Sequence, residues 1–565
     1  MPYAGRARFR ARDVRETDIF TTVQSSWDRS TGGDTAWSVT AGLAQGLFSP
    51  AFGAVGDRVA TAGTIERLRD GPVPTLFESQ PATRRRWTGR VDVRPALGRL
   101  AARHSLHAGA LVTRQTARTT VPPSPLAGEL VNGIAARIWD YGLGAPESHW
   151  ASTELAAYVS DRVTLGNRIR VDAGVRLDTA RGAARGAASS IAWLSGTPRL
   201  AVRWLLDGRG RFSLFGGYAQ YAHRLPLDYL AYGDPAAASG QVYRWDDLNA
   251  DRLVQDAERG VLIAAVGPCC TSAGPNRIDP DLDRPTTAER VAGVEGRLGS
   301  WSGRIMFVSR RDRHLVGSVN TGVTAGDYLL RHIVDVGEPF RDPPEFRLLP
   351  VYDRRPSSFG RDHYVLTNPE SHSSTYDSLD VTIEGGAGTW LRTRFDGSAY
   401  FLWAAQGNRG FGPLESDQGV TGELFENPNA ETQARGHLFF DRAYVMKWWG
   451  RVRAPGDVLA SVVARYQDGQ PFSRLAVVPD LNQGAEAING YRPGRTRFTF
   501  TLTVDAHVEK AVTVGRARIA GVVEIFNLLN TANEVEEDVV TTSSFRRPTA
   551  VQPPRAARIG VQVRF

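Results

Sequence analysis

Apolar and polar residues alternate along much of this chain with a period of two. In Arg168–Asp178 the odd positions from Ile169 to Leu177 are all apolar, and most of their even neighbours are charged. Arg497–Val508 repeats this pattern, with apolar residues at every even position. Successive side chains of a strand point to opposite faces, whereas a helix would scatter these residues around its circumference. Both segments are therefore predicted to be strands with one apolar and one polar face.

The final residues of the chain alternate in the same way. A soluble β-sandwich could end with such a strand. An outer-membrane barrel is expected to end with one, because its last strand turns apolar side chains to lipid and polar side chains to the lumen. The terminal aromatic residue also resembles the signal that the barrel-assembly machinery reads. We predict that the barrel-closing and insertion signal consists of Ile559, Val561, Val563 and Phe565.

The predicted strands are long for a soluble protein. Arg168–Asp178 and Arg497–Val508 span 11 and 12 residues, whereas strands of soluble proteins average about five or six. A tilted strand needs about 9–11 residues to cross a bilayer. Further strands are predicted at Asp18–Arg29, Thr35–Leu47, Arg86–Arg94, His104–Thr113, Leu379–Ile383, Arg394–Trp403 and Val458–Tyr466.

The connections between these strands are of two kinds. Some are tight, as at residues 165–167 and 207–210, and others are long and polar, as at residues 222–286 and 318–372. Short turns at one rim and long loops at the other are typical of outer-membrane barrels. The predicted fold is all-β: a large antiparallel transmembrane β-barrel of about 18–22 strands with long extracellular loops, forming a single domain over residues 1–565.

Composition and charge are compatible with this fold. Hydrophobic residues make up 42% of the chain, and no run approaches the ~18 apolar residues of a membrane helix. The aromatic residues (13 Trp, 16 Tyr and 23 Phe) suffice for two interfacial girdles. The basic residues that give the formal net charge of +8 are scattered along the chain and do not form the positive stripe of a nucleic-acid-binding surface. Clusters such as Arg84–Arg86 are predicted to be solvated strand ends; contact with anionic lipid headgroups is the alternative.

Two further features concern the cysteines and the N-terminus. The only cysteines, Cys269 and Cys270, are adjacent, which excludes a disulfide framework and indicates a loop feature; a vicinal disulfide within this loop is one form of it. The first residues carry no apolar signal segment, although an outer-membrane protein must be exported. A fragment, a misassigned start or an error in the barrel assignment would each explain this.

We find no catalytic signature. The chain has no His-Glu-x-x-His, no phosphate-binding Gly-x-x-x-x-Gly-Lys-Ser/Thr and no Gly-x-Ser-x-Gly. His104 and His107 are predicted to lie on opposite faces of one strand, which argues against a shared metal. The chain is therefore not expected to be an enzyme.

One loop has the spacing of a calcium site. In residues 247–258, positions 1, 3, 5, 7, 9 and 12 of an EF-hand-like loop would supply oxygen ligands to a structural Ca²⁺. The sixth position, where the motif uses glycine for a sharp turn, is Arg252. A solvated acidic loop is the alternative interpretation. The candidate ligands are Asp247, Asn249, Asp251, Leu253, Gln255 and Glu258.

Several short motifs recur along the chain in a characteristic order and spacing. They are Tyr158–Leu165, Val171–Asp178, Thr197–Arg203, Phe215–Tyr218, Ile278–Pro285, Glu289–Glu295, Ser374–Asp380 and Glu524–Asn530. Together they resemble one known family, the TonB-dependent outer-membrane receptors, and in particular the Oar-like group. The resemblance covers most of the chain from about residue 80 onward.

The resemblance implies a function and partners. It implies the barrel domain of a receptor that takes up an unidentified ligand across the outer membrane of a Gram-negative bacterium. The alternative is an outer-membrane adhesion or structural protein of the Oar-like type, and a passive porin ranks below both. The signal peptide, TonB-contacting box and plug of the family are absent from these 565 residues, and residues 1–17 are expected to be an irregular remnant of the plug–barrel connection. Expected partners are outer-membrane lipid and lipopolysaccharide, the barrel-assembly machinery, and the TonB system if a plug is supplied, but not nucleic acid.

Overall fold

The computed structural model describes most of the chain. Strands predominate in it, and among the described residues no helix is both long enough and apolar enough to cross a membrane. The described residues are 14–31, 35–52, 62–66, 82–97, 103–120, 126–143, 147–237, 239–266, 276–335, 348–404, 428–438, 441–492 and 494–564.

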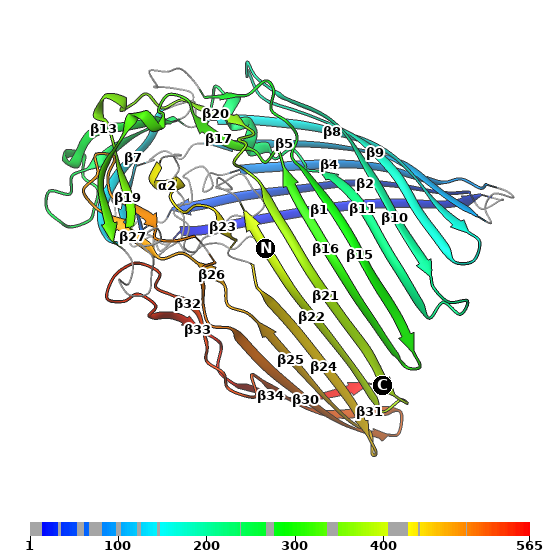
Figure 1. Ribbon diagram of the computed structural model, residues 1–565. Coiled ribbons are helices and arrows are strands. Elements are labelled where there is room, and N and C mark those ends of the chain that lie inside the picture. Colours follow the sequence, from blue (N-terminus) through cyan, green and yellow to red (C-terminus); the bar gives the residue numbers. More distant parts are fainter. Residues whose placement is uncertain are drawn as a thin grey trace.

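One antiparallel sheet of 18 strands organises the molecule (Figure 1). Each long strand pairs with the next long strand along the chain, so the sheet is a meander from β1 to β34. Its strands are β1 (Val14–Thr31), β2 (Thr35–Phe52), β4 (Ala82–Arg94), β5 (His104–Thr120), β8 (Glu147–Leu165), β9 (Ile169–Ala184), β10 (Ile191–Leu205), β11 (Phe212–Ala222), β15 (Thr286–Leu298), β16 (Trp301–Arg313), β21 (Ser374–Ala387), β22 (Leu391–Ala404), β23 (Gly436–His437), β24 (Tyr444–Ala454), β25 (Val458–Gln467), β30 (Thr501–Val514), β31 (Ala517–Phe526) and β34 (Ala556–Arg564).

This sheet confirms the predicted all-β, antiparallel fold class. The two outermost strands are β1, which pairs with β2, and β34, which pairs with β31. Among the described strands, no pairing joins β1 to β34. Closure of the cylinder by the final strand therefore stays a prediction.

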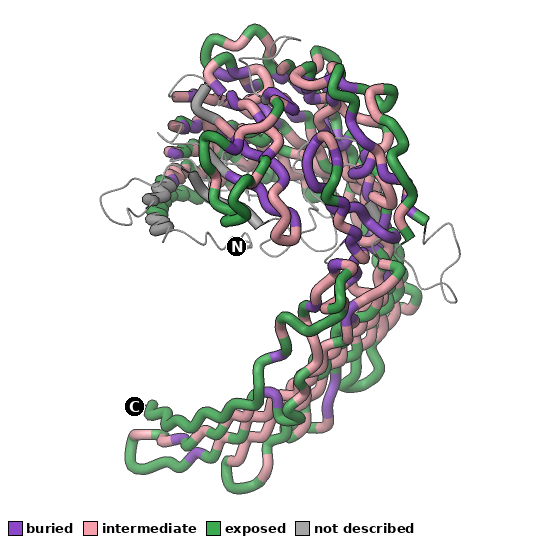
Figure 2. Tube along the Cα trace, turned by 90° about the vertical axis from the view of Figure 1, so that its left-hand side faces the viewer, coloured by how far each residue is buried: buried purple, intermediate pink, exposed green. Residues whose placement is uncertain are grey.

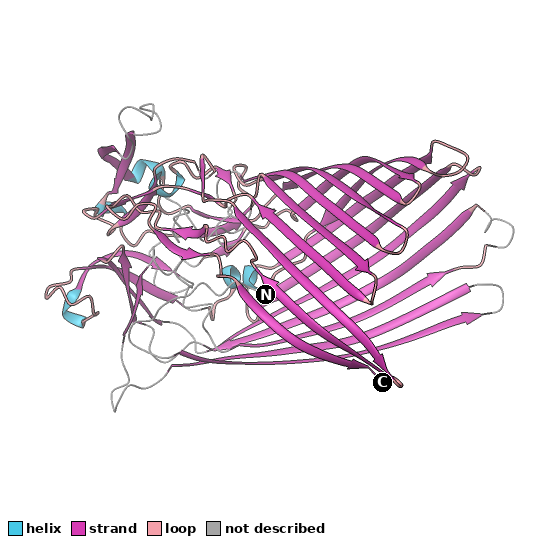
Figure 3. Cartoon of the chain, turned by 90° about the horizontal axis from the view of Figure 1, so that it is seen from below, coloured by secondary structure: helices cyan, strands magenta, loops and turns pink. Residues whose placement is uncertain are grey.

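The two ends of the sheet differ as predicted (Figures 1 and 3). At one end, tight turns join neighbouring strands, and Gly166 between β8 and β9 has a φ of 62°, a left-handed conformation that glycine adopts without strain. At the other end, the long connections carry short strands of their own. These form a five-stranded sheet of β13 (Arg259–Val266), β12 (Ser239–Trp245), β7 (Ile134–Leu143), β6 (Leu126–Val131) and β3 (Ala62–Glu66), a three-stranded sheet of β14 (Arg277–Ile278), β20 (Tyr364–Thr367) and β17 (Gly317–Asn320), and the pairs β18 (Tyr328–Asp335) with β19 (Leu348–Arg354), β26 (Pro471–Phe472) with β29 (Thr496–Arg497), β27 (Leu475–Val478) with β28 (Glu486–Asn489), and β32 (Glu534–Glu537) with β33 (Pro548–Val551).

Some element boundaries differ from those predicted. The predicted strand Arg497–Val508 is divided, because β30 begins at Thr501 and Arg497 belongs to β29. Strand β1 begins at Val14, so the last four residues of the expected irregular segment 1–17 are in a strand. Cys269 and Cys270 lie outside the described residues, as do residues 1–13 and Phe565.

The long strands present an apolar face that no other described part of the chain covers. Cross-strand neighbours on this face are apolar, as in the row formed by Leu214, Val294 and Ile305. Their exposed fractions are 42%, 36% and 48%. A soluble protein rarely exposes a continuous apolar surface of this extent, so the face is suited to lipid.

The opposite face carries charged side chains that pair within and between strands. Because these pairs satisfy the charges, this face can line an aqueous lumen. Its ion pairs include Arg176–Asp178 and Arg394–Asp396 within a strand, and Arg203–Glu295, Arg310–Glu289 and Arg465–Asp505 between strands.

Part of the β11–β15 connection packs against this polar face at its loop end. The short helix η2 (Leu227–Gly233) contacts β8 and β9. Leu225 and Leu230 are buried against Ala180 and Trp193 of the sheet in one apolar core. Figure 2 accordingly shows buried residues gathered where the loop strands lie, whereas the strands near the C-terminus are mostly exposed or intermediate.

Candidate functional site

The candidate calcium loop joins β12 to β13 in the five-stranded loop sheet. A single 3₁₀ turn, η3 (Asp256–Glu258), ends the loop. Gly128 of β6 permits the loop to pack closely, because a Cβ there would lie 2.3 Å from Val254 Cγ2 and 2.7 Å from Trp245 Cζ3. The packing of Trp245 and Val254 on β6 therefore fixes both ends of the loop on the sheet.

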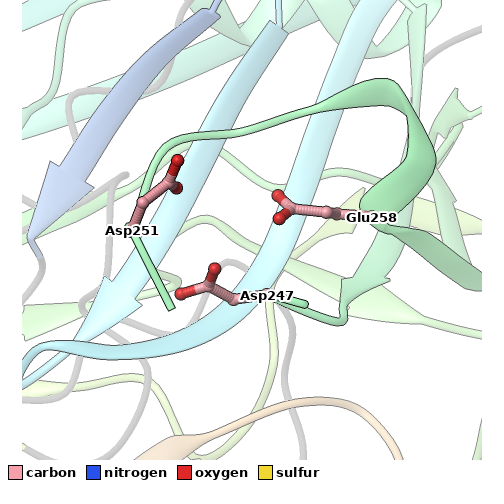
Figure 4. A group of neighbouring side chains, drawn as sticks. All are labelled: Asp247, Asp251 and Glu258. Carbon is pink, nitrogen blue, oxygen red and sulfur yellow. The ribbon is translucent and has the colours of Figure 1, made fainter. Parts of the chain in front are cut away.

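Three carboxylates of this loop converge (Figure 4). One oxygen from each of Asp247, Asp251 and Glu258 lies within 4.8 Å of the other two. Glu258 is only 2% exposed. It accepts hydrogen bonds from Trp245 Nε1 at 3.0 Å and from the backbone N–H of Leu248 at 3.3 Å and of Gln255 at 3.2 Å. The structure therefore positions this carboxylate rigidly.

The other two carboxylates are more accessible. Asp251 accepts hydrogen bonds from the Leu253 backbone N–H at 2.7 Å and from the side-chain amides of Asn249 and Gln255, both at 3.0 Å. Asp247 Oδ2 accepts the Arg252 backbone N–H at 3.2 Å, and Asp247 Oδ1 is buried with no hydrogen-bond partner among the described residues. Asp247 thus has one acceptor oxygen that is not used within the loop.

The structure brings together three of the six predicted ligands. Asn249 and Gln255 direct their amide N–H groups to Asp251. Leu253 would contribute its backbone carbonyl, and this ligand stays a prediction. Arg252 has a φ of 59°, which is the left-handed conformation for which the motif normally uses glycine. The sharp turn at the sixth position is therefore made, although a side chain is present there.

A second cluster centres on Asp92, on the polar face of β4. Its carboxylate accepts hydrogen bonds from Arg90 Nε at 2.5 Å and from the Tyr158 hydroxyl, and it lies 2.9 Å from His107 Nε2. Tyr158 reaches Asp92 across β5 at Gly109, where a Cβ would come 2.4 Å from the tyrosine oxygen. His104 instead contacts Asp161 at 2.7 Å, which confirms that the two histidines do not share one site.

Three of the four predicted C-terminal signal residues lie on the last strand of the sheet, and the fourth, Phe565, lies outside the described residues. Ile559, Val561 and Val563 are 81%, 73% and 45% exposed, and they share the apolar face with their β31 neighbours, as Ile559 does with Val523. Their role in insertion stays a prediction.

A known family matches this chain. The family model "TonB dependent receptor-like, beta-barrel" covers residues 2–304, which is more than half of the 565 residues. The chain therefore belongs to the family of TonB-dependent receptor-like β-barrels. Membership of a receptor family agrees with the expectation that the chain is not an enzyme. No curated protein matches it.

Solved structures of several receptors are similar to this chain. They include the ferric-catecholate import receptor Fiu from Escherichia coli K12 (TM-score 0.52, 10% identity), the siderophore receptor PirA from Acinetobacter baumannii (0.54, 11%) and the outer-membrane transporter YddB from Escherichia coli (0.51, 13%). Each similarity covers 97% of this chain and 64%, 62% and 66% of the respective receptor. At these identities the similarity shows the fold alone, and the chain spans less than two thirds of each receptor.

Proposed function

We propose that this chain is the membrane-embedded part of a TonB-dependent receptor that takes up a ligand across the outer membrane of a Gram-negative bacterium. The long loops capture the ligand, and the polar strand faces line its path. A plug supplied by another segment gates that path and contacts the TonB system. The barrel-assembly machinery inserts the chain, and outer-membrane lipid and lipopolysaccharide surround it.

The observation that carries this proposal is the pair of faces of the main sheet. An exposed apolar face with an ion-paired face opposite is the arrangement that a strand needs between lipid and an aqueous lumen. Membership of the receptor family supports the same function. The ligands named for the similar structures are siderophores and ferric catecholate, and uptake of an iron chelate is one form of this function.

Adhesion of the Oar-like type is the competing function. The folded loop sheets favour it as much as they favour ligand capture, because a large ordered surface outside the membrane serves both. Uptake requires a continuous polar path and a source of energy, whereas adhesion requires only the loops.

An uptake assay in the source bacterium distinguishes the two functions. Iron-starved wild-type cells, cells without this gene and cells without TonB are compared for accumulation of radiolabelled ferric chelates and for cell–cell contact. The receptor function predicts that both deletions reduce accumulation of at least one chelate. Unchanged accumulation together with a loss of cell–cell contact in the gene deletion would favour adhesion.

A structural calcium ion in the 247–258 loop is a second part of this proposal. The convergence of Asp247, Asp251 and Glu258 supports it, as does the unused oxygen Asp247 Oδ1. The left-handed conformation of Arg252 also supports it. Ca²⁺ would offset two of the three negative charges of the carboxylates and stiffen a loop outside the membrane. Sites of this kind in extracellular proteins bind Ca²⁺ at about 10⁻⁴–10⁻³ M.

Titration of the purified full chain with Ca²⁺ tests this part. We expect saturable binding that Asp247→Asn abolishes. Asp256→Asn is the matched control, because Asp256 lies in the same loop but pairs with Arg259 at 3.2 Å. No saturable binding up to millimolar Ca²⁺, or equal loss in both variants, would reject the site.

A further inference from the structure

Exposed arginines border the apolar face of the main sheet at its loop end. The face is marked by Trp87 of β4, Val112 of β5 and Leu177 of β9, which are 55%, 44% and 56% exposed. Five exposed arginines of the same parity follow toward the loop end and form what we call the outer arginine cluster. They are Arg85 of β4, Arg114 and Arg118 of β5, Arg181 of β9 and Arg185 directly after β9.

Strand pairing places Arg114 and Arg181 near each other. Thr153 of β8 lies between them and is aligned with both. Arg114 Nη1 donates a hydrogen bond to Thr153 Oγ1 at 2.7 Å. Since neighbouring strands are about 4.8 Å apart, the backbones of the two arginines are separated by about 10 Å. Two long side chains that start at this separation can reach the same oxyanion.

A second row of the cluster lies nearer the loops. Arg118 is aligned with His149 of β8, whose backbone carbonyl accepts the N–H of Arg185 at 2.9 Å. The surface of the sheet is low between the two arginine rows, so a lipid headgroup can lie there. The row between them holds only small side chains on β5, β8 and β9, namely Thr116, Ala151 and Ala183.

The outer arginine cluster has an excess of positive charge. Glu147 pairs with Arg118 and lies 3.3 Å from His149 Nε2. Within the described part of the chain, the other four arginines form no ion pair. By contrast, Arg311 of β16, which lies on the same face of the sheet, pairs with Asp377 at 2.9 Å. The cluster is therefore complementary to an anion.

The position of the cluster along the strands corresponds to lipid headgroups. On β5 the outward side chains between His104 and Arg114 are all apolar, and His104 contacts Asp161 near the turn end at 2.7 Å. Ten residues of a strand span about 33 Å, which the usual tilt of about 40° in a membrane barrel reduces to a height of about 25 Å. The apolar band of an outer-membrane barrel is about 25 Å tall. Arg114 therefore lies at the loop-side edge of this band.

We propose that the outer arginine cluster binds the phosphate groups of a lipopolysaccharide molecule in the outer leaflet. Guanidinium groups bind phosphate through paired N–H donors. The cluster is on the lipid-facing side of the sheet, so a membrane lipid is expected there rather than a free anion. This inference rests on the proposed function, which places this face against lipid, and it specifies where the surrounding lipopolysaccharide binds.

The apolar residues next to the cluster fit the same ligand. Val112 of β5 is aligned with Leu155 of β8, and Leu194 of β10 lies in the same row. Their exposed fractions are 44%, 51% and 77%. This row directly follows that of Arg114 and Arg181 toward the middle of the strands. Acyl chains that hang below a bound phosphate group would contact it.

Calorimetric titration of the purified full chain in detergent micelles tests the site. The probe is lipid A with its phosphate groups, the membrane anchor of lipopolysaccharide, dispersed in the same detergent. We expect saturable binding that Arg114→Gln and Arg181→Gln each weaken about tenfold or more, as for the loss of a charged hydrogen bond. Both side chains are exposed, so neither substitution removes packing from a core. The control Arg311→Gln, on the same face but paired with Asp377, should leave binding unchanged.

Two further probes identify the source of the phosphate. Dephosphorylated lipid A should bind about tenfold more weakly or less, and inorganic phosphate alone should show no saturable binding at the same concentrations. Equal binding of the two forms of lipid A would refute recognition of phosphate by the arginines. Saturable binding of inorganic phosphate would assign the cluster to a free anion and overturn the lipid site.

The outcomes separate this inference from the proposed function. No saturable binding of lipid A, or equal weakening by Arg311→Gln, would reject the site. Uptake that depends on TonB, found together with absent lipid A binding, would refute this inference and leave the receptor function standing. Lipid A binding without uptake in the assay above would do the reverse.

Discussion

Single residues on the polar face determine how closely neighbouring strands can interact. Gly109 of β5 leaves the space through which Tyr158 of β8 reaches Asp92 of β4. An added Cβ would lie 2.4 Å from the tyrosine oxygen and 2.6 Å from the Val91 carbonyl oxygen. The second contact is with backbone, which cannot move away as a side-chain end can.

We therefore predict that Gly109→Ala destabilises the sheet. Overpacking of this kind costs about 1–3 kcal/mol, measured as the free energy of unfolding in urea with the protein in lipid vesicles. Gly521→Ala on β31 is the control, because a Cβ there has no neighbour within 4 Å. Equal effects of the two substitutions would show that the space at Gly109 is not required.

His223 makes the packing of the β11–β15 connection dependent on pH. Burial lowers the pKa of its imidazole. The negative charge of Asp312 raises this pKa and the positive charge of Arg284 lowers it, but burial is the largest cause. Its Nε2 lies 2.8 Å from Thr287 Oγ1. Because the folded state prefers the neutral ring, protonation favours the unpacked state, and stability is lost as pH falls below about 6.5.

Hydrogen exchange of residues 223–237 measures this dependence. We expect faster exchange at pH 5.5 than at pH 7.5, after correction for the intrinsic effect of pH on exchange. His223→Gln should remove the difference, since glutamine does not titrate. A difference that persists in this variant would assign the effect to another group.

At the scale of the element, the last strand carries the clearest test of the two faces. Val561 of β34 lies on the apolar face and Gln562 on the other. Arginine on a lipid-facing position of a barrel strand costs about 2–4 kcal/mol at the bilayer midplane. We predict that Val561→Arg lowers the unfolding free energy in vesicles by an amount in this range, whereas Gln562→Arg has little effect. Equal sensitivity at both positions would contradict the assignment of the faces.

The long strands could be predicted from sequence because each has one lipid-suited and one polar face. The period-two alternation in Arg168–Asp178 follows directly from that environment, and β9 begins at Ile169, includes the rest of this segment and continues to Ala184. The short loop strands could not be predicted in this way. All four residues of β28 are buried, so both faces lie in protein and no alternation results.

The candidate sites differ in the same respect. The calcium loop is contiguous, so its spacing placed Asp247, Asp251 and Glu258 together, although it could not show that Asn249 and Gln255 turn their amides to Asp251. The cluster around Asp92 instead joins β4, β5 and β8. Its residues are far apart in sequence, so only the pairing of these strands brings His107 and Tyr158 to Asp92.

At the scale of the whole molecule, one sheet divides two environments. Its apolar face is exposed along the strands, its polar face carries ion pairs, and its loop end carries the additional sheets and the candidate calcium loop. Ligand binding is therefore expected at the loop end, and contact with lipid along the middle of the strands. The central claim is that these two faces lie against lipid and water in the outer membrane.

Accessibility of spin labels along β9 tests this claim most directly. Single cysteines are introduced at residues 171–178 of the full chain, with Cys269 and Cys270 replaced by serine, and the labelled protein is studied in outer-membrane vesicles. We predict that labels at 171, 173, 175 and 177 are accessible to oxygen dissolved in lipid, and that those at 172, 174, 176 and 178 are accessible to a water-soluble nickel chelate. Uniform accessibility to the chelate along the strand would contradict the account.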